Sequence, residues 1–254
     1  MKKRIVLMAN DVPGVEVCKY LIANGDQLVR LYLHEPDKQK NGQEIIAASN
    51  CSDIYFSPVL KERDHIAGLQ ALEPHYIITV YWAYLLSEQV IDSATEGTVN
   101  FHPALLPINR GWYPHVHSIL DGSPTGVTLH LIDKTADTGA IWAQKEVPLT
   151  PYDTAFEIYR RLQREIVKLF VDSWPKIVSG ELTPIPQEES KAVYHKKSEV
   201  DDLDRLDLEP YMKVEKLVDI LRARSFGNKG FAYFDKDGQR VFVNIRLSHT
   251  TSFE

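Results

Sequence analysis

The chain has 254 residues, of which 44% are hydrophobic and 25% charged, and a formal net charge of −6. These values are typical of a soluble protein with one large domain, or a main and a small one, whose core needs no disulfide or metal. The acidic balance argues against a large RNA partner, since 12 Lys/Arg accompany 13 Asp/Glu from Gln187 onward. Apolar runs are too short for a membrane span, so we expect a cytoplasmic protein with no membrane or nucleic-acid partner.

The first half of the chain alternates strand-like and helix-like segments. Short apolar runs predict strands at Arg4–Ala9, Gln27–His34, Asp53–Phe56 and His75–Trp82. Segments with helical spacing lie between them, at Val15–Ala23, Gly42–Ala48 and Arg63–Leu72. This alternation predicts an α/β fold with a mostly parallel sheet, right-handed crossovers and helices on both faces. In such sheets, ligands bind beyond the carboxyl ends of the strands.

The second half predicts the end of this domain and a smaller one. Two strands, at Gly126–Ile132 and Ala140–Val147, precede a long amphipathic helix at about Thr154–Val178. The proline-rich segment Thr183–Gln187 is interpreted as an exit linker. In the tail we expect an acidic loop at Asp201–Glu209 and a helix at Val214–Arg224. Two strands should follow, Phe231–Phe234 and Val241–Leu247, joined by a turn at Asp235–Gly238. We therefore expect a main domain over residues 1–186 and a small α+β subdomain over 187–254.

Residues 99–141 contain the side chains that we consider as catalytic candidates. Asn100 and His102 are two residues apart, so on an extended segment they project from the same face, and Pro103 ends the strand after them. Asparagine supplies an amide donor for a developing oxyanion, and histidine supplies an acid–base group. Asp137 lies in a turn that can bring its carboxylate close. Together, these side chains indicate a site for acyl transfer to a nitrogen nucleophile.

The ordered set of motifs over this stretch resembles the signature of the folate-dependent formyltransferases. The motifs are Asn100-x-His102-Pro103, Leu105-Leu106-Pro107, Arg110-Gly111, Gly126-Val127-Thr128-x-His130 and Asp137-x-Gly139-x-Ile141. The resemblance covers roughly residues 1–186. It implies a Rossmann-like main domain and 10-formyltetrahydrofolate as the donor, with no covalent enzyme intermediate.

The resemblance also implies roles for particular residues. Asn100 and His102 would stabilise the oxyanion while Asp137 holds His102 and helps to move protons. The pterin would be bound by two loops, represented by Tyr81, Trp82, Ala83, Tyr84, Leu85, Asp133 and Gly139.

The class of acceptor substrate is indicated by the sequence Arg110-Gly111-Trp112-Tyr113-Pro114. Within the family it looks most like the sugar N-formyltransferases, which act on nucleotide-linked 4-amino-4,6-dideoxy sugars carried by UDP, dTDP or GDP. A diphosphate needs cations and a base needs aromatic surfaces. The residues that we expect to bind the acceptor are Asn10, Arg110, Trp112, Tyr113, Lys196, Arg222 and Arg224.

Other interpretations remain open. His115 and His117, together with His102, suggest a metal site. A helix starting at Pro114 would separate the rings of His115 and His117, so we expect no metal. His130 is interpreted as an interior histidine that supports the site. The rival functions are a methionyl-tRNA or glycinamide ribonucleotide formyltransferase and a folate-binding regulatory module without turnover. By resemblance to the sugar enzymes, we also expect a homodimer.

Overall fold

The computed structural model describes residues 2–209 and 211–249, which divide into two compact units. The first unit comprises residues up to His102, Val127–Lys145 and Gln163–Gln187. The second comprises Pro103–Gly126, Glu146–Leu162 and the chain from Glu188 onward. The compact units therefore do not follow one boundary between residues 186 and 187, because two earlier segments join the tail.

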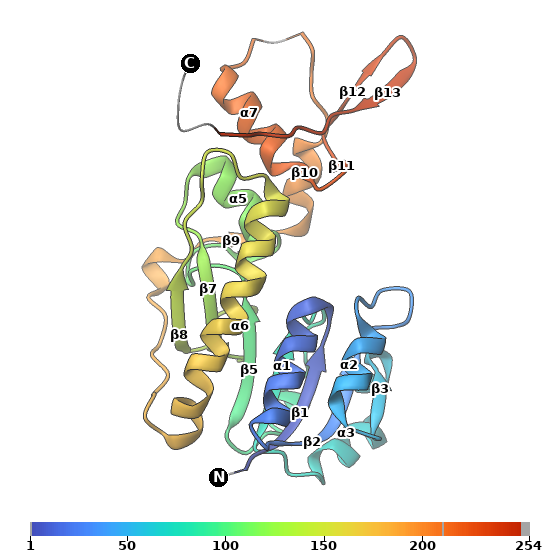
Figure 1. Cartoon of the computed structure of the whole chain (residues 1–254), viewed down its shortest axis with the longest axis vertical. Coiled ribbons are helices and arrows are strands. Elements are labelled where there is room, and N and C mark those ends of the chain that lie inside the picture. Colours follow the sequence, from blue (N-terminus) through green and yellow to red (C-terminus); the bar gives the residue numbers. More distant parts are fainter. Residues whose placement is uncertain (1, 210, 250–254) are drawn as a thin grey trace. The chain divides into compact units, whose positions relative to one another are not determined.

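A seven-stranded sheet forms the centre of the first unit (Figure 1). Its strand order is β3-β2-β1-β4-β5-β7-β8. The strands are β1 (Arg4–Ala9), β2 (Gln27–Leu33), β3 (Ile54–Phe56), β4 (Tyr76–Val80), β5 (Gly97–His102), β7 (Gly126–Leu131) and β8 (Ile141–Glu146). The first five in this order run parallel, and β7 is antiparallel to β5. The expected α/β fold with a mostly parallel sheet is confirmed.

Helices cover both faces of this sheet. The helices of the first unit are α1 (Asp11–Ala23), α2 (Gly42–Ser49), the 3-10 helix η1 (Ser57–Lys61), α3 (Arg63–Gln70), α4 (Glu88–Ile91) and most of α6 (Ala155–Ser179). On one face, Val6, Met8 and Ile77 of the strands pack with Ile66 and Leu69 of α3. The alternate residues Ile5 and Leu7 are also fully buried, as expected for a parallel sheet that is covered on both faces.

The other face of the sheet is covered by α1 and α6. Phe101 of β5 contacts Phe170 of α6, with ring centroids 5.0 Å apart, and Tyr76 of β4 contacts Trp174 at the same distance. The Trp174 indole also donates a 2.9 Å hydrogen bond to Asp26. The α6 helix thus supports the two strands, β4 and β5, that carry Thr79 and Asn100.

The second unit contains short elements. They are β6 (Arg110–Gly111), α5 (Pro114–Asp121), η2 (Glu189–Lys191), β9 (Tyr194–His195), η3 (Lys197–Leu203), α7 (Val214–Ala223), β10 (Ser225–Phe226), β11 (Lys229–Gly230), β12 (Tyr233–Lys236) and β13 (Gln239–Phe242). Strand β6 pairs in parallel with β9, which ties the tail to the segment after Pro103.

Several elements of the tail differ in their bounds from those predicted from the sequence. The hairpin turns at Asp237-Gly238 alone, both with positive φ, so Asp235 and Lys236 belong to a strand. The expected strand Val241–Leu247 ends at Phe242, and part of the expected acidic loop is the 3-10 helix η3. A two-residue turn with two left-handed residues matches the twist of paired strands, which explains the tighter hairpin.

Among the described residues, no helix combines the length and the apolar character that crossing a membrane requires.

The fold predicts that Phe170→Ala destabilises the protein by about 3–5 kcal/mol, because a fully buried aromatic ring between β5, α1 and Trp174 is lost. Urea unfolding followed by tryptophan fluorescence measures this change. The control is Lys168→Ala on the solvent side of the same helix, which we expect to change the free energy of unfolding by less than about 0.5 kcal/mol.

Candidate active site

The end of β5 gathers the polar side chains of the first unit. Asn100 lies beside Thr79 of β4 on one side and opposite His130 of β7 on the other. His102, two residues along, lies opposite Thr128. Because side chains alternate along a strand, these residues share one face at the carboxyl end of β5. This is the edge where parallel sheets bind ligands.

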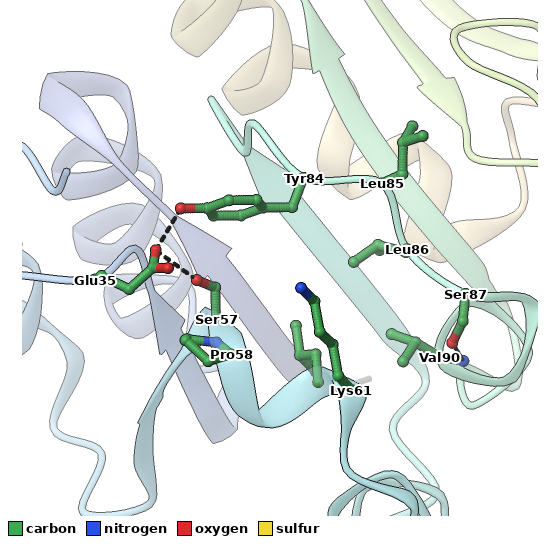
Figure 2. Close-up of a pocket in the computed structure, with 10 residues that line it drawn as sticks. Glu35, Ser57, Pro58, Lys61, Tyr84, Leu85, Leu86, Ser87 and Val90 are labelled. Atoms are coloured by element: carbon green, nitrogen blue, oxygen red, sulfur yellow. Dashed lines mark hydrogen bonds between the residues drawn. The ribbon is translucent and has the colours of Figure 1, made fainter.

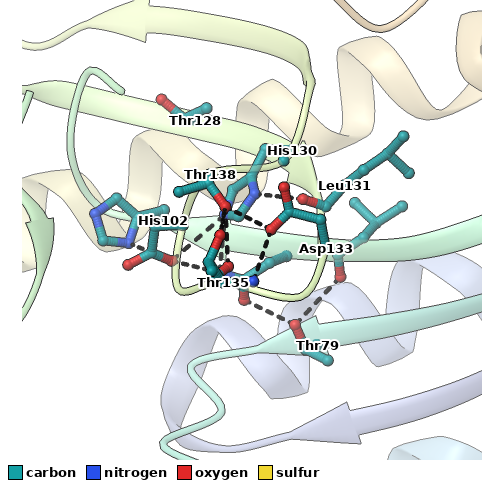
Figure 3. Close-up of polar contacts among 12 residues, drawn as sticks. Thr79, His102, Thr128, His130, Leu131, Asp133, Thr135 and Thr138 are labelled. Carbon is teal, nitrogen blue, oxygen red and sulfur yellow. Dashed lines mark hydrogen bonds and ion pairs between the residues drawn. The ribbon is translucent and has the colours of Figure 1, made fainter. Parts of the chain in front are cut away.

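Thr79 and His130, both labelled in Figure 3, hold the amide of Asn100 from its two ends. Its Oδ1 accepts a 2.7 Å hydrogen bond from the hydroxyl of Thr79, and its Nδ2 lies 3.0 Å from Nε2 of His130. The Nδ1 of His130 lies 2.7 Å from the carbonyl oxygen of Leu131, which only accepts, so that nitrogen carries the proton. Nε2 of the neutral ring then accepts from Asn100. Thr79 and His130 therefore set the direction in which the amide donates.

Asp137 faces this pair from the loop between β7 and β8. Its Oδ1 lies 3.5 Å from Nδ1 of His102, 3.5 Å from Nδ2 of Asn100 and 3.6 Å from Nε2 of His130. His102 and Asp137 are both largely buried. A carboxylate at this distance can orient the ring of His102. The arrangement provides an amide donor, a proton carrier and a fixed negative charge within one site.

The loop that carries Asp137 is organised by its own side chains and by a glycine. Oδ1 of Asp133 accepts from the backbone of Thr135 at 3.1 Å and from the hydroxyl of Thr138 at 2.5 Å. A Cβ on Gly139 would stand 1.8 Å from the carbonyl oxygen of Leu131, so only glycine allows this close approach. The structure thus gives two of the residues expected to bind the cofactor, Asp133 and Gly139, a role in shaping the loop.

The loop after β4 is the second expected cofactor loop. Its aromatic rings surround His34: Trp82 and Tyr84 each lie 4.9 Å from the His34 ring. Burial lowers the pKa of His34, and the neutral ring accepts a long 3.4 Å hydrogen bond from the backbone of Ala83. Tyr81 has a positive φ of 53°, which starts the turn, and the side chain of Leu85 is exposed.

A pocket of about 220 Å³ lies beside this loop (Figure 2). Its lining is Glu35, Ser57, Pro58, Leu60, Lys61, Tyr84, Leu85, Leu86, Ser87 and Val90. The hydroxyl of Tyr84 donates to Glu35, and this bond lowers the pKa of the carboxyl group to about 2. The pocket therefore has apolar walls, one ionised carboxylate and one exposed cation, Lys61, which suits an elongated ligand with polar ends.

The residues expected to bind the acceptor fall in both units. Asn10 follows β1 in the first unit, where its Oδ1 accepts a 2.7 Å hydrogen bond from the backbone of Lys40. The other six lie in the second unit. Trp112 is partly exposed, with the ammonium of Lys197 5.1 Å from its ring centre and Tyr113 5.8 Å away, and Lys196 is exposed.

Three of the expected cations are buried in ion pairs or backbone contacts. Arg110 pairs with Glu189 through two bonds of 3.0 and 2.6 Å. Arg224 pairs with Asp204 through Nε and Nη2. Arg222 donates to the carbonyl oxygens of Asp153 and Thr150 and pairs with Asp219. The contacts of Arg110 and Arg222 hold the tail against residues 103–126 and 146–162, and the pair of Arg224 links two parts of the tail, so each guanidinium already has a structural role.

A histidine cluster in the second unit has the residue types of a metal site. His117, His195 and Glu199 have donor atoms within 4.8 Å of one another. The two rings stack 3.5 Å apart at an angle of 6°, so their lone pairs lie in parallel planes and do not converge on one ion. His195 instead bonds to Asn109 and Glu199 at 2.9 Å each. We interpret this cluster as structural, and the absence of a bound metal stays a prediction.

Sequence reasoning missed Thr79 and understated His130. Both would follow from placing β4 and β7 beside β5, since register then aligns them with Asn100. It also missed Gln187, which donates to the backbone of the loop that carries Asp137.

Comparison with known proteins adds two family matches. Residues 21–173 match the family described as formyl transferase. Residues 199–249 match the N-formyltransferase dimerization C-terminal domain.

Individual relatives and structures agree with the first match. A methionyl-tRNA formyltransferase of Geobacillus is 30% identical to this chain over 200 residues. The match covers 75% of this chain and 63% of the length of that relative. The Mycobacterium tuberculosis protein Rv3404c, a candidate sugar N-formyltransferase, is 26% identical with a TM-score of 0.82, covering 99% and 100% of the two chains.

A third comparison is with the formyltransferase PseJ of Anoxybacillus kamchatkensis, solved with UDP-4,6-dideoxy-4-formamido-L-AltNAc and tetrahydrofolate. It is 28% identical, with a TM-score of 0.58, covering 78% of this chain and 88% of PseJ.

The network predicts that Thr79→Val lowers turnover about tenfold, because the amide of Asn100 loses the partner that fixes its Oδ1. The matched control is Thr98→Val on β5, a buried threonine whose hydroxyl donates to Ile91 at 3.0 Å instead. Steady-state kinetics should show the loss for Thr79→Val alone. Equal losses in both variants would assign the effect to stability.

Proposed function

We propose that this chain, which belongs to the formyl transferase family, transfers a formyl group from 10-formyltetrahydrofolate to the amino group of a nucleotide-linked 4-amino-4,6-dideoxy sugar. One observation carries the reaction type: Oδ1 of Asp137 lies 3.5 Å from both Asn100 and His102 at the carboxyl end of β5. That set provides an oxyanion donor, a proton carrier and a fixed charge for acyl transfer to nitrogen.

Each side chain has a defined part in the proposed reaction. The donor, when bound, supplies the formyl carbon and leaves as tetrahydrofolate. Asn100 donates an N–H to the formyl oxygen as negative charge develops there, and the fixed orientation of its amide reduces the reorganisation needed. His102 takes part in the same stabilisation and carries the proton released by the attacking amine to the departing folate nitrogen. Asp137 holds the imidazole and stabilises the positive charge that the ring gains when it takes this proton.

The donor site is proposed from the two loops beside this set. The residues Tyr81–Leu85 and Asp133–Gly139 follow strands that flank Asn100, and the first loop also lines the 220 Å³ pocket. A reduced folate is elongated, with an aromatic pterin and an anionic tail. The apolar walls of the pocket and the exposed ammonium of Lys61 fit the two ends of such a molecule.

A sugar nucleotide is favoured as acceptor over a tRNA. The match to Rv3404c covers nearly the whole of both chains, and the PseJ complex contains a nucleotide-linked formamido sugar. The net charge of −6 gives no electrostatic footprint for a large RNA. Methionyl-tRNA stays the second candidate because of the Geobacillus relative.

A coupled turnover assay tests the proposal. The full chain is mixed with 10-formyltetrahydrofolate and a panel of UDP-, dTDP- and GDP-linked 4-amino-4,6-dideoxy sugars, with methionyl-tRNA and glycinamide ribonucleotide as comparison acceptors. Tetrahydrofolate release with one sugar supports the proposal and identifies the base. Release only with methionyl-tRNA or glycinamide ribonucleotide would move the function to that acceptor. Binding of 5-formyltetrahydrofolate without release from any acceptor would favour a regulatory module.

The catalytic assignment predicts that His102→Ala and Asp137→Asn each lower kcat at least about a hundredfold while the protein stays folded, because an acid–base or charge-stabilising group is lost. Circular dichroism and urea unfolding check the fold. Near-normal kcat in both variants would contradict the assignment of these roles.

We also propose a homodimer formed through the tail. Residues 199–249 match a dimerization domain, and apolar side chains in that range are exposed: Leu208, Val214, Val241 and Phe242. Burying such side chains against a second copy removes them from water, which stabilises an association.

Sedimentation velocity measures this state directly. We expect Phe242→Asp to shift the dimer toward monomer, because a charge enters the apolar surface. The matched control is Gln239→Asp on the same strand, where an exposed polar residue receives the same charge. A monomeric native chain at all concentrations would exclude this interface.

A further inference from the structure

The segment after α6 is more than a connection between elements. Residues Thr183–Gln187, here called the strap, lie along the loop that presents Asp137. Ile185 forms an antiparallel bridge with Ile141, and the two backbone hydrogen bonds are 2.8 Å each. The strap is therefore fixed to the strand that begins just after the loop.

Gln187, the last residue of the strap, forms two hydrogen bonds with the loop that carries Asp137. Its Nε2 donates to the carbonyl oxygens of Asp137 and Gly139, at 2.8 Å each. A primary amide has two N–H bonds, so one side chain serves both carbonyls. These carbonyls lie at either end of the turn Asp137-Thr138-Gly139. The contact therefore fixes the shape of the turn that carries the carboxylate.

Asp137 has a φ of 58°, in the left-handed region. Aspartate is one of the few residues other than glycine that adopt this conformation, as single residues in turns. Other contacts hold neighbouring parts of the loop: Asp133 bonds to Thr138, and the backbone N–H of Leu131 donates to Ala140 at 2.8 Å. Gln187 acts on the backbone of Asp137 itself.

The position of Asp137 matters because its contacts are at the limit of hydrogen-bond range. Oδ1 lies 3.5 Å from Nδ1 of His102 and 3.5 Å from Nδ2 of Asn100. Hydrogen bonds from nitrogen to oxygen normally span about 2.7–3.2 Å, so a loop shift of about 1 Å would either complete or abolish these contacts. We propose that Gln187 is a positioning residue for the reaction, which keeps the Asp137 carboxylate within reach of His102 and Asn100. This inference rests on the catalytic role proposed for Asp137.

Two substitutions separate the donor function from packing. Gln187→Met keeps the length of the side chain and removes both donors, and we expect kcat to fall about tenfold with an unchanged KM for the acceptor. Gln187→Glu keeps the shape but turns an oxygen toward two carbonyl oxygens, so we expect a larger loss. The matched control is Ile185→Ala, because that side chain is exposed while its backbone holds the bridge. It should retain the kcat of the native chain.

A double-mutant cycle tests whether Gln187 acts through Asp137. In the Asp137→Asn background, Gln187→Met should lower kcat by less than about twofold, because the group that it positions is already lost. The same tenfold loss in both backgrounds would overturn the inference. If Asp137→Asn alone is fully active, the proposed catalytic role fails. If Asp137→Asn is impaired but Gln187→Met is not, only the positioning role fails.

Hydrogen–deuterium exchange tests the same contact without any acceptor. In Gln187→Met, we expect the amides of residues 134–141 to exchange at least about fivefold faster than in the native chain, with the rest of the sheet unchanged. Ile185→Ala should keep the native rates. Unchanged exchange in this loop of Gln187→Met would overturn the inference, whatever the turnover data give.

Discussion

The site depends on β5, which pairs in parallel with β4 on one side and antiparallel with β7 on the other. Parallel pairing places Thr79 beside Asn100, and antiparallel pairing places His130 opposite it. A one-residue slip in either register would turn every side chain of that strand to the other face and separate the network. The aromatic contacts of α6 with Tyr76 and Phe101 stabilise β4 and β5 in this arrangement.

Once the register is set, the neighbours of each polar group decide whether it donates or accepts a hydrogen bond. The carbonyl of Leu131 requires a proton on Nδ1 of His130, the neutral Nε2 accepts from Asn100, and Thr79 donates to the other end of the amide. Reversing the direction of these hydrogen bonds in a buried site would cost free energy, because buried polar groups would lose their partners. An amide whose orientation is set before the substrate binds is what stabilisation of a developing oxyanion needs.

The second unit obeys a different constraint, the burial of charge. Arg110, Arg222 and Arg224 had the residue type expected for a diphosphate ligand, yet each is buried against carboxylates or backbone carbonyls. A buried guanidinium must be paired. The contacts of Arg110 with Glu189 and of Arg222 with the carbonyl of Asp153 also join segments that are distant along the chain. Sequence alone could not separate a ligand-binding arginine from one that joins segments, because both require the same side chain.

The sequence by itself determined the α/β fold and most strands of the sheet, and its motif indicated Asn100, His102 and Asp137 as candidate catalytic residues. Hydrophobic periodicity and local spacing are properties of short segments, and they are readable without neighbours. The tertiary structure alone decided which side chains support that motif. Thr79, His130 and Gln187 are 21, 30 and 87 residues from Asn100 in the sequence, and only strand pairing and the return of the chain after α6 bring them to the site. Contacts of this kind depend on register and on the path of the chain, and no local pattern encodes either one.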